Sequence, residues 1–244
     1  MKKLLAVVVG TIAALAVALV DPAGAQEAAC EGPEGPIPAT ITGSGFILGT
    51  AGDDVIAGSA GRDIILAGAG DDIVCGNGGN DYIDGGAGND VLIGGEDGPP
   101  FGAQGSADTL IGGPGDDILV GLTGPDTLIG GDGDDEIIGF GGNDRIVAGD
   151  GDDTVFAGPG SDIVTGDDGE DTLWGNFGSD IIFGGRGEDE IDGDNPFVGN
   201  PPPGSLPNTA TPDFCSGGAG ADAIFNCEFG DPSQPRAPGP APEM

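Results

Sequence analysis

The stretch Gly85-Gly86-Ala87-Gly88-Asn89-Asp90-Val91-Leu92-Ile93 decides the fold of this 244-residue chain, because its pattern recurs every nine residues. Between residues 54 and 189 every ninth residue is Asp, with Pro99 as the one exception. Two residues after each of these positions stands an apolar residue; two residues before stands Gly, except at Asp97 and Ser106. A repeat of fixed period is interpreted first, since each copy is one structural unit that packs on its neighbours.

Each unit joins a glycine turn to a short strand. Glycine takes backbone angles that other residues resist, and the last three residues are β-formers with one side chain facing inward and two outward. Such a chain winds into a coil with two strands per turn, so residues two repeats apart stack at about 4.7–4.9 Å. Aspartates then form a column on each edge: Asp54, Asp72 and Asp90 belong to one, Asp63 and Asp81 to the other.

A column of carboxylates at that spacing repels itself unless cations lie between the levels. Carboxylate oxygens together with the carbonyl oxygens of glycine turns are the ligands that Ca²⁺ prefers, whereas Mg²⁺ favours octahedral sites that retain waters. Zinc and copper favour His or Cys, and the chain has no His. Asp as a mere solubilising turn residue is the alternative, but turns do not require Asp in one slot fifteen times. The predicted calcium ligands are Asp54, Asp63, Asp72, Asp81, Asp90, Asp108, Asp117, Asp126, Asp135, Asp144, Asp153, Asp162, Asp171, Asp180 and Asp189.

The unit Gly-Gly-x-Gly-x-Asp-x-apolar-x, as in residues 85–93, 112–120 and 184–192, resembles the haemolysin-type calcium-binding repeat of the RTX family. The resemblance covers roughly residues 49–192, with a further copy at 217–225. It implies an all-β fold, a right-handed parallel β-roll solenoid of nonapeptide repeats, with Ca²⁺ held between the loops of adjacent turns by the repeat aspartates and loop carbonyls. Some units depart from the pattern, and the residues that replace the second glycine are Thr50, Ser59, Asn77, Leu122, Phe140, Asp167 and Asn176.

The number of ions can be bounded from pairs of aspartates eighteen residues apart. There are twelve, starting at Asp54, Asp63, Asp72, Asp90, Asp108 and Asp117 and at each repeat aspartate from Asp126 to Asp171. About a dozen Ca²⁺ ions is therefore the upper expectation. Arg62 replaces the usual Asp or Asn beside Asp63 and is expected to weaken that site, and Asp222 is out of phase with the series.

The chain divides into six segments. Residues 1–25 are predicted to be a signal peptide, with a basic start, an apolar run over 4–20 and a small-residue cleavage site at 23–25; a retained anchor is the alternative. The others are a Pro/Gly-rich lead-in (26–39), the calcium-binding β-roll (40–192), a Pro-rich loop (193–216), the last repeat copy and cap (217–229) and a disordered tail (230–244).

Two places in the roll are irregular. Residues 40–48 predict a degenerate first coil with Ile47 in the core and Gly45 in the place of the aspartate. Residues 94–111 are irregular but two repeat lengths long. They predict either two degenerate units or one unit with a nine-residue bulge containing Pro99 and Pro100, and in both cases one continuous roll.

Composition excludes several kinds of partner. The chain has 42 acidic and 6 basic residues and a formal net charge of −36. Such a surface repels nucleic acid and anionic membranes, so no nucleic-acid partner and no membrane insertion after leader removal are expected. Four cysteines in an exported chain predict two disulfides with three possible connectivities. Cys215–Cys227 is favoured because one loop and strand between them returns the chain near its start, which leaves Cys30–Cys75.

The favoured function is a secreted, extracellular calcium-ion-binding repeat protein whose fold depends on Ca²⁺, acting as a structural or interaction module. The alternative is the accessory repeat region of a secreted enzyme, toxin or adhesin-like protein. Without His there is no zinc-protease motif, Ser-His-Asp triad or His base, so the chain is not expected to be an enzyme. An ice-binding face would need uninterrupted Thr ladders, and the outward aromatics Phe156, Trp174 and Phe183 suit lateral packing better than a ligand patch. The sequence identifies no protein or polysaccharide partner.

Overall fold

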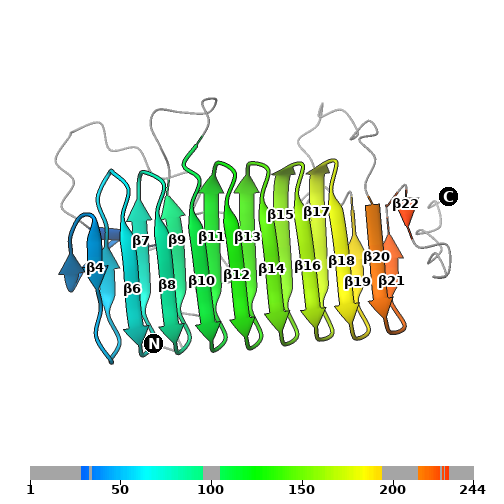
Figure 1. Ribbon diagram of the computed structural model, residues 1–244, viewed down its shortest axis with the longest axis horizontal. Coiled ribbons are helices and arrows are strands. Elements are labelled where there is room, and N and C mark those ends of the chain that lie inside the picture. The colour runs from blue at the N-terminus through cyan, green and yellow to red at the C-terminus, as the bar shows by residue number, and fades with distance from the viewer. Residues whose placement is uncertain are drawn as a thin grey trace.

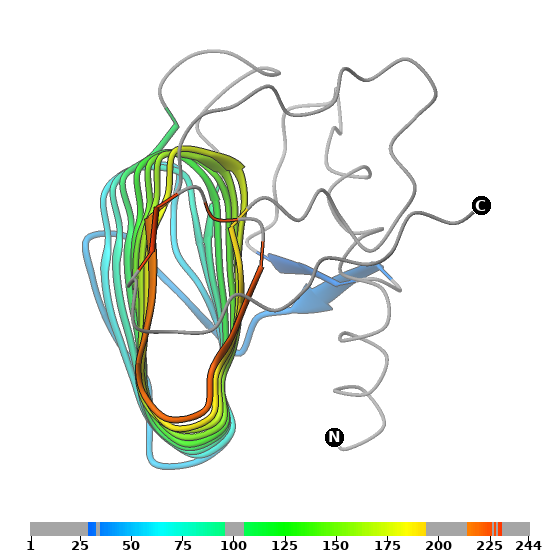
Figure 2. The same cartoon turned by 90° about the vertical axis from the view of Figure 1, so that its right-hand side faces the viewer.

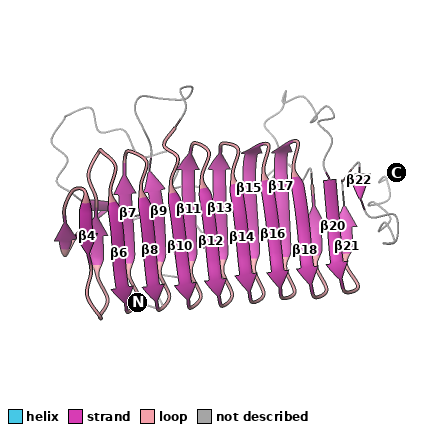
Figure 3. Cartoon of the chain, in the orientation of Figure 1, coloured by secondary structure: helices cyan, strands magenta, loops and turns pink. Residues whose placement is uncertain are grey.

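The computed structural model describes residues 29–32, 35–95, 105–193, 214–225, 227 and 229–230. Regular structure in these residues consists of strands (Figure 3). None of them forms a helix long and apolar enough to cross a membrane. The predicted signal peptide (1–25) lies outside the described residues, as do the predicted tail after Gly230 and most of the predicted loop over 193–216.

Two ten-stranded parallel sheets form the body of the molecule (Figure 1). The even sheet consists of β4 (Phe46–Leu48), β6 (Ile64–Ala69), β8 (Tyr82–Ala87), β10 (Thr109–Pro114), β12 (Thr127–Asp132), β14 (Arg145–Asp150), β16 (Ile163–Asp168), β18 (Ile181–Arg186), β20 (Phe214–Ala219) and β22 (Phe229–Gly230). The odd sheet consists of β3 (Ile41–Thr42), β5 (Val55–Ala57), β7 (Ile73–Asn77), β9 (Val91–Gly95), β11 (Ile118–Thr123), β13 (Glu136–Gly141), β15 (Thr154–Gly160), β17 (Thr172–Gly178), β19 (Glu190–Asp192) and β21 (Ala223–Phe225).

The chain alternates between the sheets, so each turn of the coil contributes one strand to each (Figure 2). Thr109 pairs with Thr127, and Thr127 with Arg145, a step of eighteen residues. The predicted parallel β-solenoid with two strands per turn is therefore confirmed. We call the turns from an even to the next odd strand the lower edge and those from an odd to the next even strand the upper edge, as they lie in Figure 1.

The solenoid continues through both interruptions of the repeat. Tyr82 pairs with Thr109, a step of 27 residues, so nine residues are extra in that turn. This confirms the second alternative for residues 94–111, one unit with a nine-residue insertion. Ile181 pairs with Phe214, a step of 33 residues, so fifteen are extra there. Both insertions fall at the upper edge, between β9 and β10 and between β19 and β20.

The core is a double file of apolar side chains, one from the middle of each three-residue strand pattern. In β8, Ile83 is buried while Tyr82 and Asp84 on either side are half-buried, as alternation requires. Ile47 is buried at the start of the file, which confirms the predicted first coil. The strand-centre members are Ile47, Ile56, Ile65, Val74, Ile83, Leu92, Leu110, Leu119, Leu128, Ile137, Ile146, Val155, Val164, Leu173, Ile182, Ile191 and Cys215.

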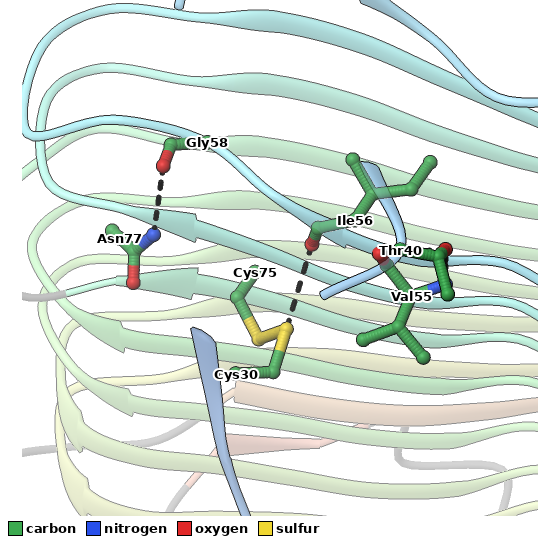
Figure 4. The surroundings of a disulfide bond; sticks show 7 residues. All are labelled: Cys30, Thr40, Val55, Ile56, Gly58, Cys75 and Asn77. Atoms are coloured by element: carbon green, nitrogen blue, oxygen red, sulfur yellow. Dashed lines mark hydrogen bonds between the residues drawn. A yellow bond between two sulfur atoms is a disulfide. The ribbon is translucent and has the colours of Figure 1, made fainter. Parts of the chain in front are cut away.

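Both predicted disulfides are present, Cys30–Cys75 and Cys215–Cys227. Cys30 belongs to a separate antiparallel hairpin, β1 (Ala29–Gly32) and β2 (Gly35–Pro38). The Cys30 Sγ atom lies 3.4 Å from the Ile56 carbonyl oxygen, and Cys75 is an outward-facing residue of β7 (Figure 4). The first disulfide therefore fixes the hairpin to the outer face of the odd sheet at β5 and β7.

Candidate metal centre

The fifteen predicted aspartates lie in two columns, one along each edge, and each is at most 8% exposed. Each stands immediately before its strand, where the glycine turn delivers the chain back to a sheet (Figure 2). The lower column is Asp54, Asp72, Asp90, Asp117, Asp135, Asp153, Asp171 and Asp189, followed by Asp222. The upper column is Asp63, Asp81, Asp108, Asp126, Asp144, Asp162 and Asp180.

One carboxylate oxygen of each aspartate holds the column together. The backbone N–H of Asp117 donates to Asp135 Oδ1 at 2.8 Å, and that of Asp135 donates to Asp153 Oδ1 at 2.8 Å. The same bond recurs from level to level in both columns. At the start of the upper column Gly45, which lacks a carboxylate, still donates its N–H to Asp63 Oδ1.

The other carboxylate oxygen is left over in most turns. Among the described residues it is buried without a hydrogen-bond partner in Asp72, Asp90, Asp117, Asp126, Asp135, Asp144, Asp153, Asp162, Asp171 and Asp189. A buried charged oxygen without a partner is costly, because desolvation is not offset. Each of these Oδ2 atoms therefore requires a proton or a cation.

In the turns that begin with glycine, the orphaned oxygen faces that glycine and a carbonyl of the next level. A Cβ built on Gly121 would lie 2.5 Å from Asp126 Oδ2 and 3.0 Å from the Gly139 carbonyl oxygen. One built on Gly139 would lie 2.5 Å from both Asp144 Oδ2 and the Ala157 carbonyl oxygen. In these turns the missing side chain leaves a small space lined by a carboxylate and a carbonyl oxygen, whereas the turns of Asp72, Asp153 and Asp162 have the buried Ala67, Ala148 and Ala157 in the same slot.

This donor set fits Ca²⁺, which takes carboxylate and carbonyl oxygens in flexible cages. Within the described residues no three His, Cys, Asp or Glu side chains converge on one point. A site in these columns would therefore draw on one carboxylate per level and complete its shell with backbone carbonyls. Residues of the predicted type are in place; the ligand role of the fifteen aspartates stays a prediction.

Burial raises the pKa of ten column carboxyls, against the lowering effect of the N–H donated to each; these are Asp72, Asp90, Asp117, Asp126, Asp135, Asp144, Asp153, Asp162, Asp171 and Asp189. The raised pKa is about 8 for Asp117, Asp126, Asp153 and Asp162. Neighbouring carboxylates add to the rise: Asp90 and then Asp135 in the case of Asp117. The pKa of Asp135 is raised to about 7, and those of Asp90, Asp144 and Asp171 to about 6. Without metal, Asp117, Asp126, Asp153 and Asp162 would hold protons at neutral pH.

Three turns differ because a hydroxyl takes the second oxygen. Asp54 Oδ2 accepts from the Thr50 N–H at 2.7 Å and from Thr50 Oγ1 at 2.9 Å. Asp63 Oδ2 accepts from the Ser59 N–H at 2.6 Å and from Ser59 Oγ at 2.9 Å. Ser106 Oγ donates to Asp108 Oδ2 at 3.1 Å. These carboxylates are satisfied by the chain itself, so their need for a cation is smaller.

The backbone explains why Thr50 and Ser59 act differently from other replacements of the second glycine. Asn77, Leu122, Phe140, Asp167 and Asn176 keep the positive φ that glycine has in this slot, between 65° and 80°. Thr50 and Ser59 do not adopt it, and their N–H groups point at the carboxylate. The sequence signal was present, a Ser or Thr four residues before the aspartate, but its effect depends on the turn conformation.

Two expectations about the columns are corrected. Asp90 does not stack with Asp108: its N–H donates to Asp117 Oδ1, and Asp81 donates to Asp108 Oδ1, because nine residues are looped out between β9 and β10. Asp222, out of phase in sequence, lies in the lower column, where its Oδ1 accepts from the Asp189 N–H at 3.3 Å. Arg62 is exposed, and Ser59 rather than Arg62 is the residue that changes the turn of Asp63.

The lower edge carries a second, exposed row of acids. The Asp71 N–H donates to Asp53 Oδ1, and the Asp134 and Asp152 N–H groups donate to Asp116 and Asp134 Oδ1 at 3.0–3.1 Å. The equivalent slots of the upper edge hold Arg62, Asn80, Ala107, Pro125, Asn143, Ser161 and Ser179. The lower edge therefore attracts cations more strongly.

A parallel solenoid with buried carboxylates in its glycine turns defines a class, the calcium-binding β-rolls built of nonapeptide repeats. The RTX calcium-binding nonapeptide repeat (4 copies) matches this chain at residues 41–74, 48–83, 76–98, 104–128, 111–139, 120–155, 138–173 and 165–195. The matches span more than half of the chain, which belongs to the RTX calcium-binding nonapeptide repeat family. A search of curated proteins finds no match.

Proposed function

We propose that this is a secreted, extracellular calcium-binding repeat protein whose roll is completed by Ca²⁺ in the two aspartate columns. The observation that carries the proposal is the set of buried Oδ2 atoms without a partner. A divalent cation between levels would neutralise two such oxygens, and the formal charge of −36 would fall accordingly. The number of ions expected is about a dozen or fewer, since three turns satisfy their own carboxylates.

Calcium affinity would couple directly to folding. The aspartates and carbonyls come together only when the coils stack, so the unfolded chain has no preformed site and binding free energy becomes folding free energy. Extracellular modules bind Ca²⁺ at about 10⁻⁴–10⁻³ M, a concentration met outside cells. The two disulfides also suit an oxidising compartment.

The decisive experiment is a Ca²⁺ titration of the chelated protein, followed by circular dichroism and by calorimetry for stoichiometry. We expect a cooperative gain of β-structure at millimolar Ca²⁺, with Mg²⁺ a poor substitute. A chelated chain with the same β-spectrum and the same melting curve as the loaded one would refute calcium-driven folding. Secretion is checked separately, by recovering from the medium a chain that begins at Gln26.

We infer that the protein is a structural or interaction module and not an enzyme. All buried carboxylates of the described residues belong to the two columns, so none is left to serve as an acid or base in a cleft. The runner-up, an accessory region of a secreted enzyme, toxin or adhesin-like protein, predicts that a catalytic chain co-purifies from the medium. Isolation of the secreted protein free of hydrolase activity supports the module.

A further inference from the structure

The outer faces of the two sheets differ in how far they are covered. On the odd sheet, the outward side chains Ile118, Val120 and Ile138 are at most 9% exposed, and the hairpin with Cys30 lies over β5 and β7. On the even sheet, the first and third residues of each strand from β4 to β18 all point outward and are exposed or half-buried. Several other outward residues of the odd sheet are half-buried, so the even face is the more open of the two.

Apolar side chains gather at both ends of the even face. The N-terminal patch consists of Phe46, Leu48 and Ile64, which are 62%, 58% and 39% exposed. The C-terminal patch consists of Ile163, Ile181, Phe183 and Phe214, which are 39–40% exposed. Contiguous exposed apolar surface of this kind marks an interaction site.

The charge is balanced in the part of this face formed by the first and third strand positions, although the chain as a whole has a net charge of −36. From β4 to β18, the outward first and third positions carry a single acid, Asp84 of β8, and a single base, Arg145 of β14. Between them lie β10 and β12, whose outward residues are Thr109 and Ile111, and Thr127 and Ile129. The face is thus arranged almost symmetrically about the line between β10 and β12.

We propose that two copies of this chain pack face to face through their even sheets, about a two-fold axis that is parallel to the strands and runs between β10 and β12. The interface about such an axis is isologous: both copies use the same surface, so each contact between two different residues occurs twice. It places β4 on β18, β6 on β16, β8 on β14 and β10 on β12 of the other copy. The facing residues are then Phe46 and Ile181, Leu48 and Phe183, Ile64 and Ile163, Thr109 and Thr127, and Ile111 and Ile129.

Charge selects this register. It brings Arg145 onto Tyr82 and beside Asp84 of the partner copy, so the two charges of the face form an ion pair. A register shifted by one strand, with the axis through β12, leaves both charges opposite neutral residues. That shifted register also places Asp132, at the lower end of β12, against its own copy, a like-charge contact that is unfavourable.

The lower ends of the strands support the same register. Asp132, Asp150 and Asp168 are exposed there. In the proposed pairing they face Pro114, Ala87 and Ala69, which end β10, β8 and β6. No carboxylate at these strand ends then opposes another one directly.

The face is large enough for a stable contact. Eight strands at about 4.8 Å and about six residues per strand at about 3.3 Å cover roughly 750 Å² per copy, close to the roughly 800 Å² per partner of a standard interface. Sheets packed in this way lie about 10 Å apart with interdigitating side chains. The proposal is independent of how many ions the columns hold, but the copies must be folded.

Sedimentation velocity of the full chain in millimolar Ca²⁺ and physiological salt tests the proposal, with circular dichroism confirming that each sample is folded. We expect a dimer. In the Arg145→Asp variant the introduced carboxylate repels Asp84 of the other copy, which should raise the dissociation constant at least about ten-fold. Arg62→Asp makes the same charge change on the upper edge and should leave the dimer intact. Adding Asp84→Arg to Arg145→Asp restores the ion pair with reversed signs and should restore dimerisation.

Cysteine cross-linking tests the register. In Leu48→Cys/Phe183→Cys the two new thiols meet between copies and should give a covalent dimer, whereas Leu66→Cys/Phe183→Cys, which fits the shifted register, should not. A folded, calcium-loaded chain that remains a monomer overturns the proposal. A dimer unaffected by Arg145→Asp, or one cross-linked only through the variant at Leu66, overturns the assigned interface. Failure to fold in Ca²⁺ would instead count against the proposed function.

Discussion

The first aspartate-bearing turn of each edge and the middle turns contain the same buried aspartate, yet they satisfy it in different ways. In the first turns Thr50 and Ser59 donate both N–H and hydroxyl to the second carboxylate oxygen. In the middle turns, from Asp117 to Asp171, that oxygen has no hydrogen-bond partner, and in the turns that begin with glycine it faces that glycine and a carbonyl. One solenoid therefore contains turns closed by the chain itself and turns in which a buried carboxylate oxygen is left without a partner.

Closure of the carboxylate by hydroxyl groups suits the N-terminal end of the roll. The first coil has a neighbour on only one side, so a cation there would have few oxygens to bind. Hydroxyl closure and the Cys30–Cys75 disulfide both act within these coils. We therefore expect the N-terminal coils to remain ordered when the rest of the roll is not.

Chelation should separate the two regions most clearly. With EDTA at neutral pH we expect amides of β11 to β17 to lose nearly all protection from hydrogen exchange, because their carboxylates lose the cation. Amides of β5 to β7 should stay partly protected through the hydroxyls and the disulfide. Hydrogen-exchange mass spectrometry reports both regions in one experiment. Uniform loss of protection along the chain would contradict the distinction between closed and open turns.

Removal of one charge should have a large effect in an open turn and a small one in a closed turn. Asp135→Asn keeps the Oδ1 acceptor and the shape but removes the charge, so we expect the Ca²⁺ midpoint of folding to rise several-fold, equivalent to about 1–2 kcal/mol. Asp54→Asn is the matched change in the same column, and its midpoint should move little. Equal shifts in the two circular dichroism titrations would show that Thr50 does not replace the ion.

Asp222 provides an intermediate case. It lies at the end of the lower column, after fifteen extra residues, where it stacks on Asp189. Asp222→Asn should therefore raise the midpoint by less than Asp135→Asn but by more than Asp54→Asn, as measured in the same titration. A midpoint identical to that of the unaltered chain would place Asp222 outside the calcium-binding column.

A single substitution at Ser59 should convert a turn closed by a hydroxyl into one whose carboxylate oxygen is open to a cation. Ser59→Gly removes the hydroxyl donor from Asp63 Oδ2 and lets the backbone at position 59 take the positive φ that glycine has in this slot, which turns the N–H away from the carboxylate. We expect a loss of about 1 kcal/mol in the metal-free state, the usual cost of such a hydrogen bond, together with one additional Ca²⁺ in calorimetry. Ser161→Gly alters a serine whose side chain lies on the exposed rim and serves as the control. A stoichiometry unchanged by Ser59→Gly would argue against the closed turn.

Much of this architecture could be predicted from sequence because its period is strict. The two columns, the inward Ile83 or Leu128 and both disulfides follow from counting residues. Counting failed where the chain loops out: Asp108 keeps its nine-residue phase in sequence, but the insertion places it in the upper column instead of the lower one, so Asp90 meets Asp117. It also missed Thr50 and Ser59, because their role depends on a φ angle and not on residue type alone.

The smallest expected effect is a reversal of pH dependence between metal-free and loaded protein. Burial raises the pKa of Asp126 and Asp162 to about 8 and that of Asp144 to about 6, from an ordinary value near 3.8. A raised carboxyl pKa favours the metal-free fold below the unfolded value, and this contribution is lost as pH rises through the folded values of about 6 to 8. Calcium requires the ionised form, so its binding should release protons and weaken as pH falls through the same window.

In chelator we therefore expect the β-signal to be greater at acid pH than at pH 8.5, and in Ca²⁺ the midpoint to fall as pH rises. Asp126→Asn removes a titrating group from the window and should flatten both trends slightly, whereas Asp54→Asn, in a closed turn, should not. Circular dichroism and calorimetry in two buffers of different ionisation enthalpy measure the trends and the protons released. Parallel pH dependence with and without Ca²⁺ would mean that the buried oxygens exchange neither proton nor cation.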